Sequence, residues 1–171
     1  MPRYVAFLRG VMPTNLKMAD LRRAAEEAGG TAVRTLLASG NVVFDAPSRS
    51  EAAVTRALEA AIAARSGRAF RAFVRRQADL GTLVAADPFA SLPLPAAAKR
   101  IVTFLASPPD PPPALPVEHE GVRVFALSGR EVLTAYLPHP RGPVFMTLLE
   151  RLFGTEATTR TWDTVRKCAA G

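Results

Sequence analysis

Three short stretches of this 171-residue sequence combine a cation or an amide with a glycine, a hydroxyl or a helix start. They are Leu8-Arg9-Gly10, which leads into a polar loop with Lys17, then Ser39-Gly40-Asn41, and finally Thr158-Thr159-Arg160-Thr161-Trp162. Such groups can hold an anion, because free backbone N–H groups and a helix N-terminus favour negative charge. Turn formation and helix capping are the competing interpretation of each stretch. We predict that the three stretches converge on one anion-binding site.

The charge of the chain is consistent with such a site. The sequence carries 22 basic and 15 acidic side chains, and residues 1–85 hold 13 of the basic and 7 of the acidic groups. The positive field therefore belongs to the first half, where it could attract a phosphate-bearing ligand, nucleic acid included. A solvated arginine-rich surface would give the same totals. The predicted ligand-binding residues are Arg9, Lys17, Ser39, Asn41 and Arg160, with Arg71 and Arg75 adding to the field.

The sequence lacks the motifs on which several other kinds of chemistry depend. The sequence has no dinucleotide-binding, P-loop, nucleophile-elbow or zinc-protease motif, and no nucleophile–base pair can be named from spacing, so the catalytic residues stay unknown. The single Cys168 excludes a disulfide framework and a multi-thiolate zinc site, and it fits a cytoplasmic protein. No uncharged apolar run approaches the roughly 18 residues of a membrane helix, so no membrane partner is expected.

The two histidines are candidates for metal ligands or acid–base groups. His119 and His139 lie 20 residues apart in proline-flanked loops, without thiols or a carboxylate at ligand spacing. We therefore expect no metal and no cofactor, and we expect His139 to be an exposed loop residue. The run Glu118-His119-Glu120 is interpreted as a solvated turn, with an acid–base cluster as the alternative.

The predicted sites must be positioned by an alternation of strands and helices in the first half. Hydrophobic periodicity and turn residues predict six elements in the order β-α-β-β-α-β, followed by a short helix over 77–86. Thr14 or Asn15 could cap the first helix, and Ser48 and Glu51 have capping-box spacing at the second. The predicted strands are Tyr4–Leu8, Val33–Leu37, Asn41–Asp45 and Ala69–Arg75, and the second helix presents Val54, Leu58 and Ile62 and ends at Ser66-Gly67.

That order predicts an α+β fold with a ferredoxin-like N-terminal half, whose four-stranded antiparallel sheet carries both helices on one face. The other face must be covered or used. Alternation places Arg71, Phe73 and Arg75 together on one side of their strand, which predicts a basic face with an aromatic at its centre.

A connector and a second, smaller α+β half follow. We predict boundaries at 1–86, a Pro/Ala-rich connector at 87–98, and a second half over 99–171 with a proline-rich loop at 108–116. The second half is expected to hold three strands, Ile101–Leu105, Val122–Leu127 and Glu131–Leu137, and two helices, the last capped by Thr161. Its relation to the first half stays open, because no internal repeat is evident.

Five blocks carry a family resemblance across nearly the whole chain. Leu8-Arg9-Gly10, Lys17-Met18-x-x-Leu21, Val33-Arg34-Thr35, Ser39-Gly40-Asn41-Val42-Val43-Phe44 and Thr158-Thr159-Arg160-x-Trp162-x-Thr164-Val165-x-Lys167 resemble the DUF1697 family of uncharacterised, mostly bacterial proteins. The resemblance implies a small cytosolic α+β protein with ferredoxin-like halves and no established activity. This chain departs from the family in having no glycine between Gly10 and Asn15, where Pro13 removes a backbone donor, and in having Asp163 after Trp162.

Three functions are compatible with these observations. The favoured one is non-catalytic binding of a phosphate-bearing or otherwise anionic ligand. The second is an enzyme that acts on a small phosphorylated or acidic metabolite held by arginine and lysine. The third is a homodimeric interaction protein that buries Phe7 and Phe73 against a second copy, so the sequence allows a monomer or a homodimer.

Overall fold

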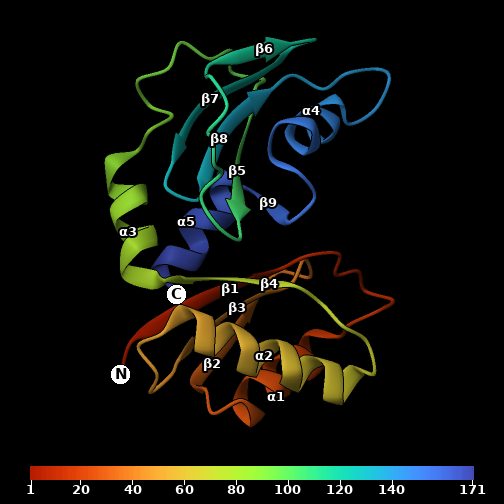
Figure 1. The fold of residues 1–171 in the computed structure, drawn as a ribbon, viewed down its shortest axis with the longest axis vertical. Helices are drawn as coiled ribbons and strands as arrows, with labels where there is room; N and C mark the ends of the chain where they lie inside the picture. Colours follow the sequence, from red (N-terminus) through yellow and green to blue (C-terminus); the bar gives the residue numbers. More distant parts are fainter. The chain divides into compact units, whose positions relative to one another are not determined.

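The computed structural model describes residues 1–171 and contains two antiparallel sheets and five helices (Figure 1). The chain forms two compact units. The first consists of Met1–Ala86 together with Arg166–Gly171, and the second of Asp87–Val165. Every helix falls short of the length and apolar character needed to cross a bilayer.

The first unit has the predicted element order. It contains β1 (Arg3–Leu8), α1 (Met18–Glu27), β2 (Thr31–Leu36), β3 (Asn41–Asp45), α2 (Glu51–Ser66), β4 (Ala72–Arg76) and α3 (Gln77–Ala86), and the end of α5 (Trp162–Ala170). The strands pair antiparallel in the order β2-β3-β1-β4. The predicted bounds of β3 and α3 are confirmed, whereas β4 begins three residues later than expected.

The core of the first unit lies between the sheet and two helices. Figure 1 shows α1 and α2 side by side on one face of the sheet. Alternate residues of each strand point to that face, and the predicted stripe of α2 packs against them. The largest side chains in this core that are fully buried are Tyr4, Leu8, Leu21, Leu58 and Ile62.

The ends of α2 show how its local sequence sets its length. Ser50, rather than the predicted Ser48, is the N-cap, and its hydroxyl accepts a 3.2 Å hydrogen bond from the N–H of Ala53. Ser48 instead accepts from the N–H of Ser50, so it shapes the approach to the helix. Gly67 ends the helix in the left-handed conformation, as predicted, because glycine adopts it without a Cβ clash.

The opposite face of this sheet is not the basic surface that the alternation predicts. Val5, Phe7 and Val43 are fully buried, and Phe73 and Arg75 are each 2% exposed. Helix α3 lies against β1 and β4 and contributes the buried Leu80. Phe7 and Phe73, through which the homodimer alternative would act, are thus buried side chains of the chain itself.

The second unit contains more strands than the sequence indicates. Its elements are β5 (Lys99–Leu105), β6 (Val117–His119), β7 (Val122–Ser128), β8 (Glu131–Tyr136), α4 (Val144–Phe153), β9 (Ala157–Thr161) and the start of α5. The five strands pair antiparallel in the order β6-β7-β8-β5-β9. The expected hairpin of β7 and β8 is confirmed, but β6 and β9 are not among the three strands that the sequence predicts.

Helix α4 and one face of the five-stranded sheet form the core of the second unit. Leu148 and Leu149 of α4 join Ile101, Leu105 and Val132 in one cluster of buried side chains. Thr103 and Thr134 point to the same face, because each pairs directly with one of these residues across the β5–β8 ladder. Their hydroxyl groups are buried and have no hydrogen-bond partner.

Replacing Thr134 with valine is expected to raise the free energy of unfolding by about 1 kcal/mol, because the change removes an unsatisfied buried hydroxyl and keeps the shape. Urea denaturation would measure the effect. Thr164→Val is the matched control, since the Thr164 hydroxyl lies 2.9 Å from that of Thr161 and its loss should destabilise the chain. A Thr134→Val protein that is destabilised as much as the control would show that the hydroxyl has a partner, such as a buried water.

Candidate functional site

Most of the predicted ligand-binding residues lie in the first unit, where strand ends meet. The N–H of Leu8 donates to the carbonyl of Gly40 at 2.9 Å, and the N–H of Arg9 donates to the carbonyl of Arg71 at 3.0 Å. These bonds bring the backbone of Arg9, the β2–β3 turn and the start of β4 to one end of the sheet. Asn15 closes the adjoining loop rather than capping α1, because its amide bonds to Met12 and Gly10. Lys17, an exposed residue, precedes α1.

Asn41 holds the β2–β3 turn together. Its side chain is fully buried, and the two N–H groups of its amide donate to the carbonyl of Leu36 at 2.8 Å and to the hydroxyl of Ser39 at 3.0 Å. Both amide donors are therefore used within the turn. These contacts assign Asn41 a structural role in the segment that the sequence singled out.

Arg71 and Arg75, near the start of β4 and within it, have different surroundings. Arg71 precedes the strand, and its guanidinium lies 3.8 Å from the carboxylate of Glu59 on α2. Arg75 is buried, and its Nη1 donates to the carbonyl of Val74 at 3.0 Å. Arg71 lies just outside the strand, which begins at Ala72, whereas Arg75 lies within it.

Arg160 belongs to the second unit, apart from the other six predicted residues in the division of the chain. It lies in β9 with 8% of its surface exposed. Its Nη1 donates to the hydroxyl of Thr158 and to the carbonyl of Thr159, both at 2.8 Å. Thr161 caps the following helix, as predicted, by accepting from the N–H of Thr164 at 3.2 Å.

A pocket of about 360 Å³ in the first unit supplies a second candidate site. It lies where β4 passes directly into α3, beside the start of β1. The first residues of α3 contribute to it, and helix N-termini attract anions. The residues that line the pocket are Pro2, Arg3, Arg76, Gln77, Ala78, Gly81 and Ala169.

Arg76 is the arginine of this pocket that uses few of its N–H donors in hydrogen bonds to the protein. One N–H of its guanidinium donates to the carbonyl of Arg49 at 2.5 Å, and the group lies over the ring of Tyr4, 5.9 Å from the centroid. The Tyr4 hydroxyl is itself held by the carbonyl of Ser48 at 2.6 Å. A guanidinium has five N–H donors, so four remain after the bond to Arg49. Arg76 is thus oriented by its neighbours without being saturated by them.

Arg3 serves the pocket differently, because most of its N–H donors are already used. Its Nη1 makes a 3.0 Å ion pair with Asp45, and its Nε and Nη2 both donate to the main-chain oxygen of Gly171 at 3.2 and 3.1 Å. Asp45 compensates much of its charge. Arg3 is therefore a wall of the pocket and joins the start of β1 to the end of α5, while Arg76 is the lining arginine that has more N–H donors left over.

Sequence reasoning did not select Arg76. One signal could have pointed to it: Arg76 is the last residue of a strand, and a helix begins at the next residue, Gln77. Nothing in the spacing of residues shows which arginine keeps its donors. No group of three or more His, Cys, Asp or Glu side chains is arranged to hold a metal ion.

The fold and this pocket define a class: a small α+β protein with two antiparallel sheets and an arginine-lined pocket built on the first of them. The chain belongs to the DUF1697 family, described as "Protein of unknown function", whose model matches residues 1–133. The resemblance predicted from the sequence is thereby confirmed, although the Thr158–Trp162 block lies beyond the matched residues.

The fold is shared with a solved structure. The conserved bacterial protein SP0830 from Streptococcus pneumoniae is 18% identical in sequence and superposes with a TM-score of 0.70, covering 99% of this chain and 97% of that one. At that identity the likeness shows the fold alone. A search of the curated proteins found no match.

Proposed function

We propose that this protein binds a small phosphate-bearing or otherwise anionic ligand, without catalysing a reaction, in the pocket formed by Arg3, Arg76 and the start of α3. The observation that carries the proposal is the Arg76 guanidinium, which is fixed by Tyr4 and Arg49 and retains most of its N–H donors. A guanidinium presents parallel N–H groups that match two oxygens of a phosphate or a carboxylate. The pocket volume of about 360 Å³ suits a small molecule.

The chemistry of the pocket favours binding over catalysis. Its lining residues include two arginines, one glutamine and otherwise only Pro, Ala and Gly. An arginine stays protonated under ordinary conditions, so it is a poor general base, and no lining side chain is a nucleophile. The excess of positive charge in residues 1–85 would steer an anion toward this unit. The enzyme alternative has no comparable support in this pocket.

We also infer that the first unit follows the ferredoxin-like plan. The element order of two interleaved βαβ segments and the strand order β2-β3-β1-β4 support this inference. In such a plan the sheet edge next to α3 is formed by β4, the strand that carries Arg76. The proposed ligand would therefore bind at an edge of the sheet, beside the helix that follows it.

Substitution of Arg76 by alanine is expected to weaken binding of inorganic phosphate about tenfold, because one charge-assisted, bidentate contact is lost. Isothermal titration calorimetry at low salt would measure the affinity. Arg56→Ala is the matched control: it removes the same charge from an exposed position of α2 that does not line the pocket. Circular dichroism would confirm that both variants are folded.

The comparison of the two variants decides the proposal. Loss of phosphate binding in Arg76→Ala but not in Arg56→Ala supports the pocket. Equal loss in both variants would assign the binding to the general field of the unit and contradict the proposal. A parallel titration with single-stranded DNA over a salt series tests the nucleic-acid version, which requires a complex that weakens as salt rises and that Arg76→Ala also weakens.

A further inference from the structure

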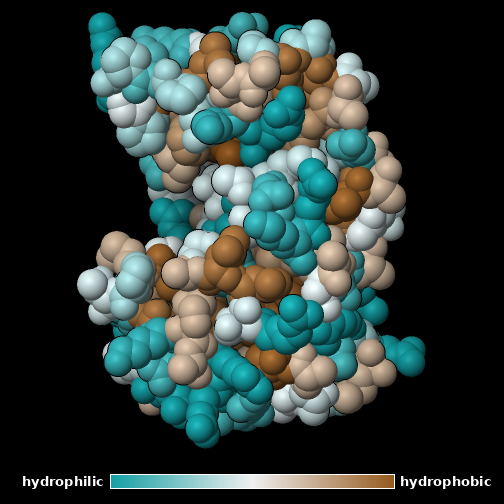
Figure 2. Space-filling view, turned by 180° about the vertical axis from the view of Figure 1, so that it is seen from behind, coloured by the Kyte–Doolittle hydropathy of each residue, from teal (hydrophilic) through white to brown (hydrophobic).

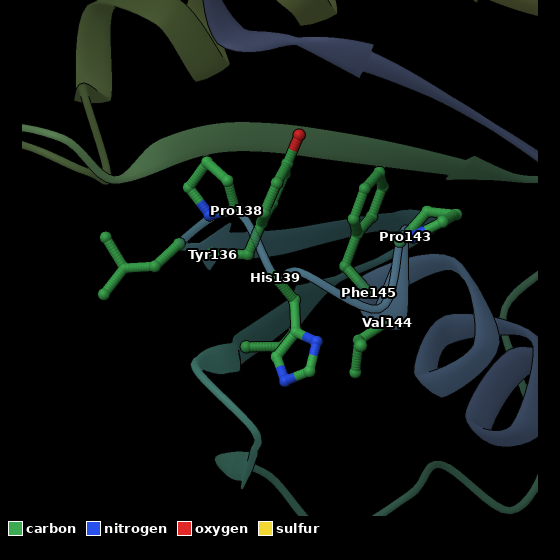
Figure 3. A pocket seen from close by; sticks show the side chains of 9 residues that line it. Tyr136, Pro138, His139, Pro143, Val144 and Phe145 are labelled. Carbon is green, nitrogen blue, oxygen red and sulfur yellow. The ribbon is translucent and has the colours of Figure 1, made fainter.

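A second pocket, of about 210 Å³, lies within the second unit and has a different character (Figure 3). The loop between β8 and α4 forms much of its wall. Tyr136 and Phe145 stack there with ring centroids 4.1 Å apart and planes inclined by 13°. Most of the lining is apolar: Val122, Tyr136, Leu137, Pro138, His139, Gly142, Pro143, Val144 and Phe145.

Besides Tyr136 with its hydroxyl, His139 is the polar side chain that lines this pocket, and a hydrogen bond fixes its orientation. Its Nδ1 accepts a 3.1 Å hydrogen bond from the backbone N–H of Arg141. An imidazole nitrogen that accepts carries no proton, so the neutral ring has its hydrogen on Nε2. The side chain is 22% exposed, in contrast to the open loop residue that the sequence predicts. The wall of the pocket thus includes an imidazole whose tautomer is set, with its N–H donor on Nε2.

The Nε2–H group of His139 faces a carboxylate but does not bond to it. The nearest oxygen of Glu120 lies 3.9 Å from Nε2, which exceeds hydrogen-bond distance. The same oxygen is 3.9 Å from Nε2 of His119, so the carboxylate stands between two imidazoles. The sequence pointed to Glu118-His119-Glu120 as a possible cluster, and the structure adds His139 to it. The Nε2–H group of His139 thus lies near the negative charge of Glu120 and makes no hydrogen bond to it.

We propose that this pocket binds a small uncharged molecule that consists of one ring-sized apolar group and a carbonyl oxygen. The apolar group would lie against the Tyr136–Phe145 stack and the prolines, where burial of apolar surface supplies the affinity. The carbonyl oxygen would accept from Nε2–H of His139, which gives a directional contact. The volume of about 210 Å³ limits the ligand to about one ring.

The charge of Glu120 makes the site selective against anions. An anionic oxygen on Nε2 of His139 would lie close to the Glu120 carboxylate, and like charges at such separations repel. A neutral carbonyl escapes that repulsion. The preference is opposite to that of the arginine-lined pocket of the first unit, so the two proposals are independent and can fail separately.

Benzamide and benzoate are matched probes for this site, because they share shape and ring and differ in charge. We expect benzamide to bind with a dissociation constant of about 1 mM, a value typical of ligands this small. Benzoate should bind at least about tenfold more weakly at neutral pH. Protein NMR titration would follow the ring signals of Tyr136 and Phe145 and the methyl signals of Val144.

Single substitutions test which side chains bind benzamide and which disfavour benzoate. His139→Asn keeps an acceptor for the N–H of Arg141 and removes the Nε2 donor, so benzamide should bind about tenfold more weakly. Glu120→Gln should bring the affinities for the two probes to within about threefold of each other, because the repelling charge is gone. Val144→Phe should fill the pocket and abolish both titrations. His119→Ala is the control, since His119 contacts Glu120 but does not line the pocket.

Each result supports or overturns the proposal. It is supported if benzamide perturbs the lining residues, if His139→Asn weakens that binding, and if His119→Ala leaves it unchanged. It is overturned if benzamide causes no saturable shift at the lining residues of the wild-type protein. Equal affinity for benzoate, or benzamide binding that survives Val144→Phe, would overturn it as well.

Discussion

The change Gly40→Ala is expected to lower the free energy of unfolding by about 2–4 kcal/mol. Gly40 has φ +87°, in the left-handed region that alanine enters only with strain. A Cβ at this position would also lie 2.8 Å from Cγ2 of Val11 and 3.2 Å from Cβ of Leu8. Val11 has a short, branched side chain, so it has little room to give. Chemical denaturation monitored by circular dichroism would measure the loss.

Two other glycines separate the strain from the steric clash. Gly10 and Gly67 have φ +75° and +73°, and a Cβ at either would meet nothing within 4 Å. Alanine at these positions should therefore cost only the backbone strain, about 1 kcal/mol. If Gly40→Ala lowers the free energy of unfolding no more than Gly10→Ala does, the close approach of Val11 to the turn adds nothing to the cost of the substitution. The comparison matters for function, since this turn carries Ser39 and Asn41.

A change at the centre of α2, Leu58→Ala, is expected to destabilise the first unit by about 2–5 kcal/mol. Leu58 is fully buried among the side chains between the helices and the sheet. The small residue would leave a cavity that the surrounding side chains fill only in part, so transfer free energy and packing are both lost. Thermal and urea unfolding would give the magnitude.

Leu58→Met is the control for this prediction, because it nearly conserves volume and should cost less than about 1.5 kcal/mol. Similar losses in the two variants would mean that the shape of leucine, rather than the filled volume, is required at this position. A small loss in Leu58→Ala would show that the layer between α2 and the sheet collapses readily around a smaller side chain.

A few large apolar side chains lie on the surface rather than in the cores. The large apolar side chains that are most exposed are Met1, Met12, Leu37 and Leu137. Seen from behind in Figure 2, hydrophobic residues form separate patches among hydrophilic ones. Leu37 has φ +61°, an uncommon conformation for a bulky residue, and it follows the segment that Asn41 holds in place.

The first unit was predicted well because its signals are local. Periodic apolar residues, glycines at helix ends and a compact turn defined α2, β3 and α3 within a residue or two. The second unit shows where local signals fail. Strand β9 has the sequence Ala-Thr-Thr-Arg-Thr, which has no apolar alternation, and it becomes a strand because β5 offers it a pairing edge.

The sites were harder to predict than the fold, for a physical reason. Sequence spacing located arginines, but the value of an arginine to a ligand depends on how many donors its neighbours use. Arg75 and Arg76 are adjacent in the chain, yet one is buried and the other keeps most of its donors. Similarly, the approach of Glu120 to His139 brings together residues from different loops, which no local pattern indicates.

The membership of Arg166–Gly171 in the first unit has a consequence for synthesis on the ribosome. The strands and helices up to Ala86 emerge early, but the oxygen of Gly171 that Arg3 binds and the carbonyl of Cys168 that Gln77 reaches are translated only after the second unit. At about 5–20 residues per second, several seconds separate the two events. The earliest part of the nascent chain therefore waits for these partners until Arg166–Gly171 have been made.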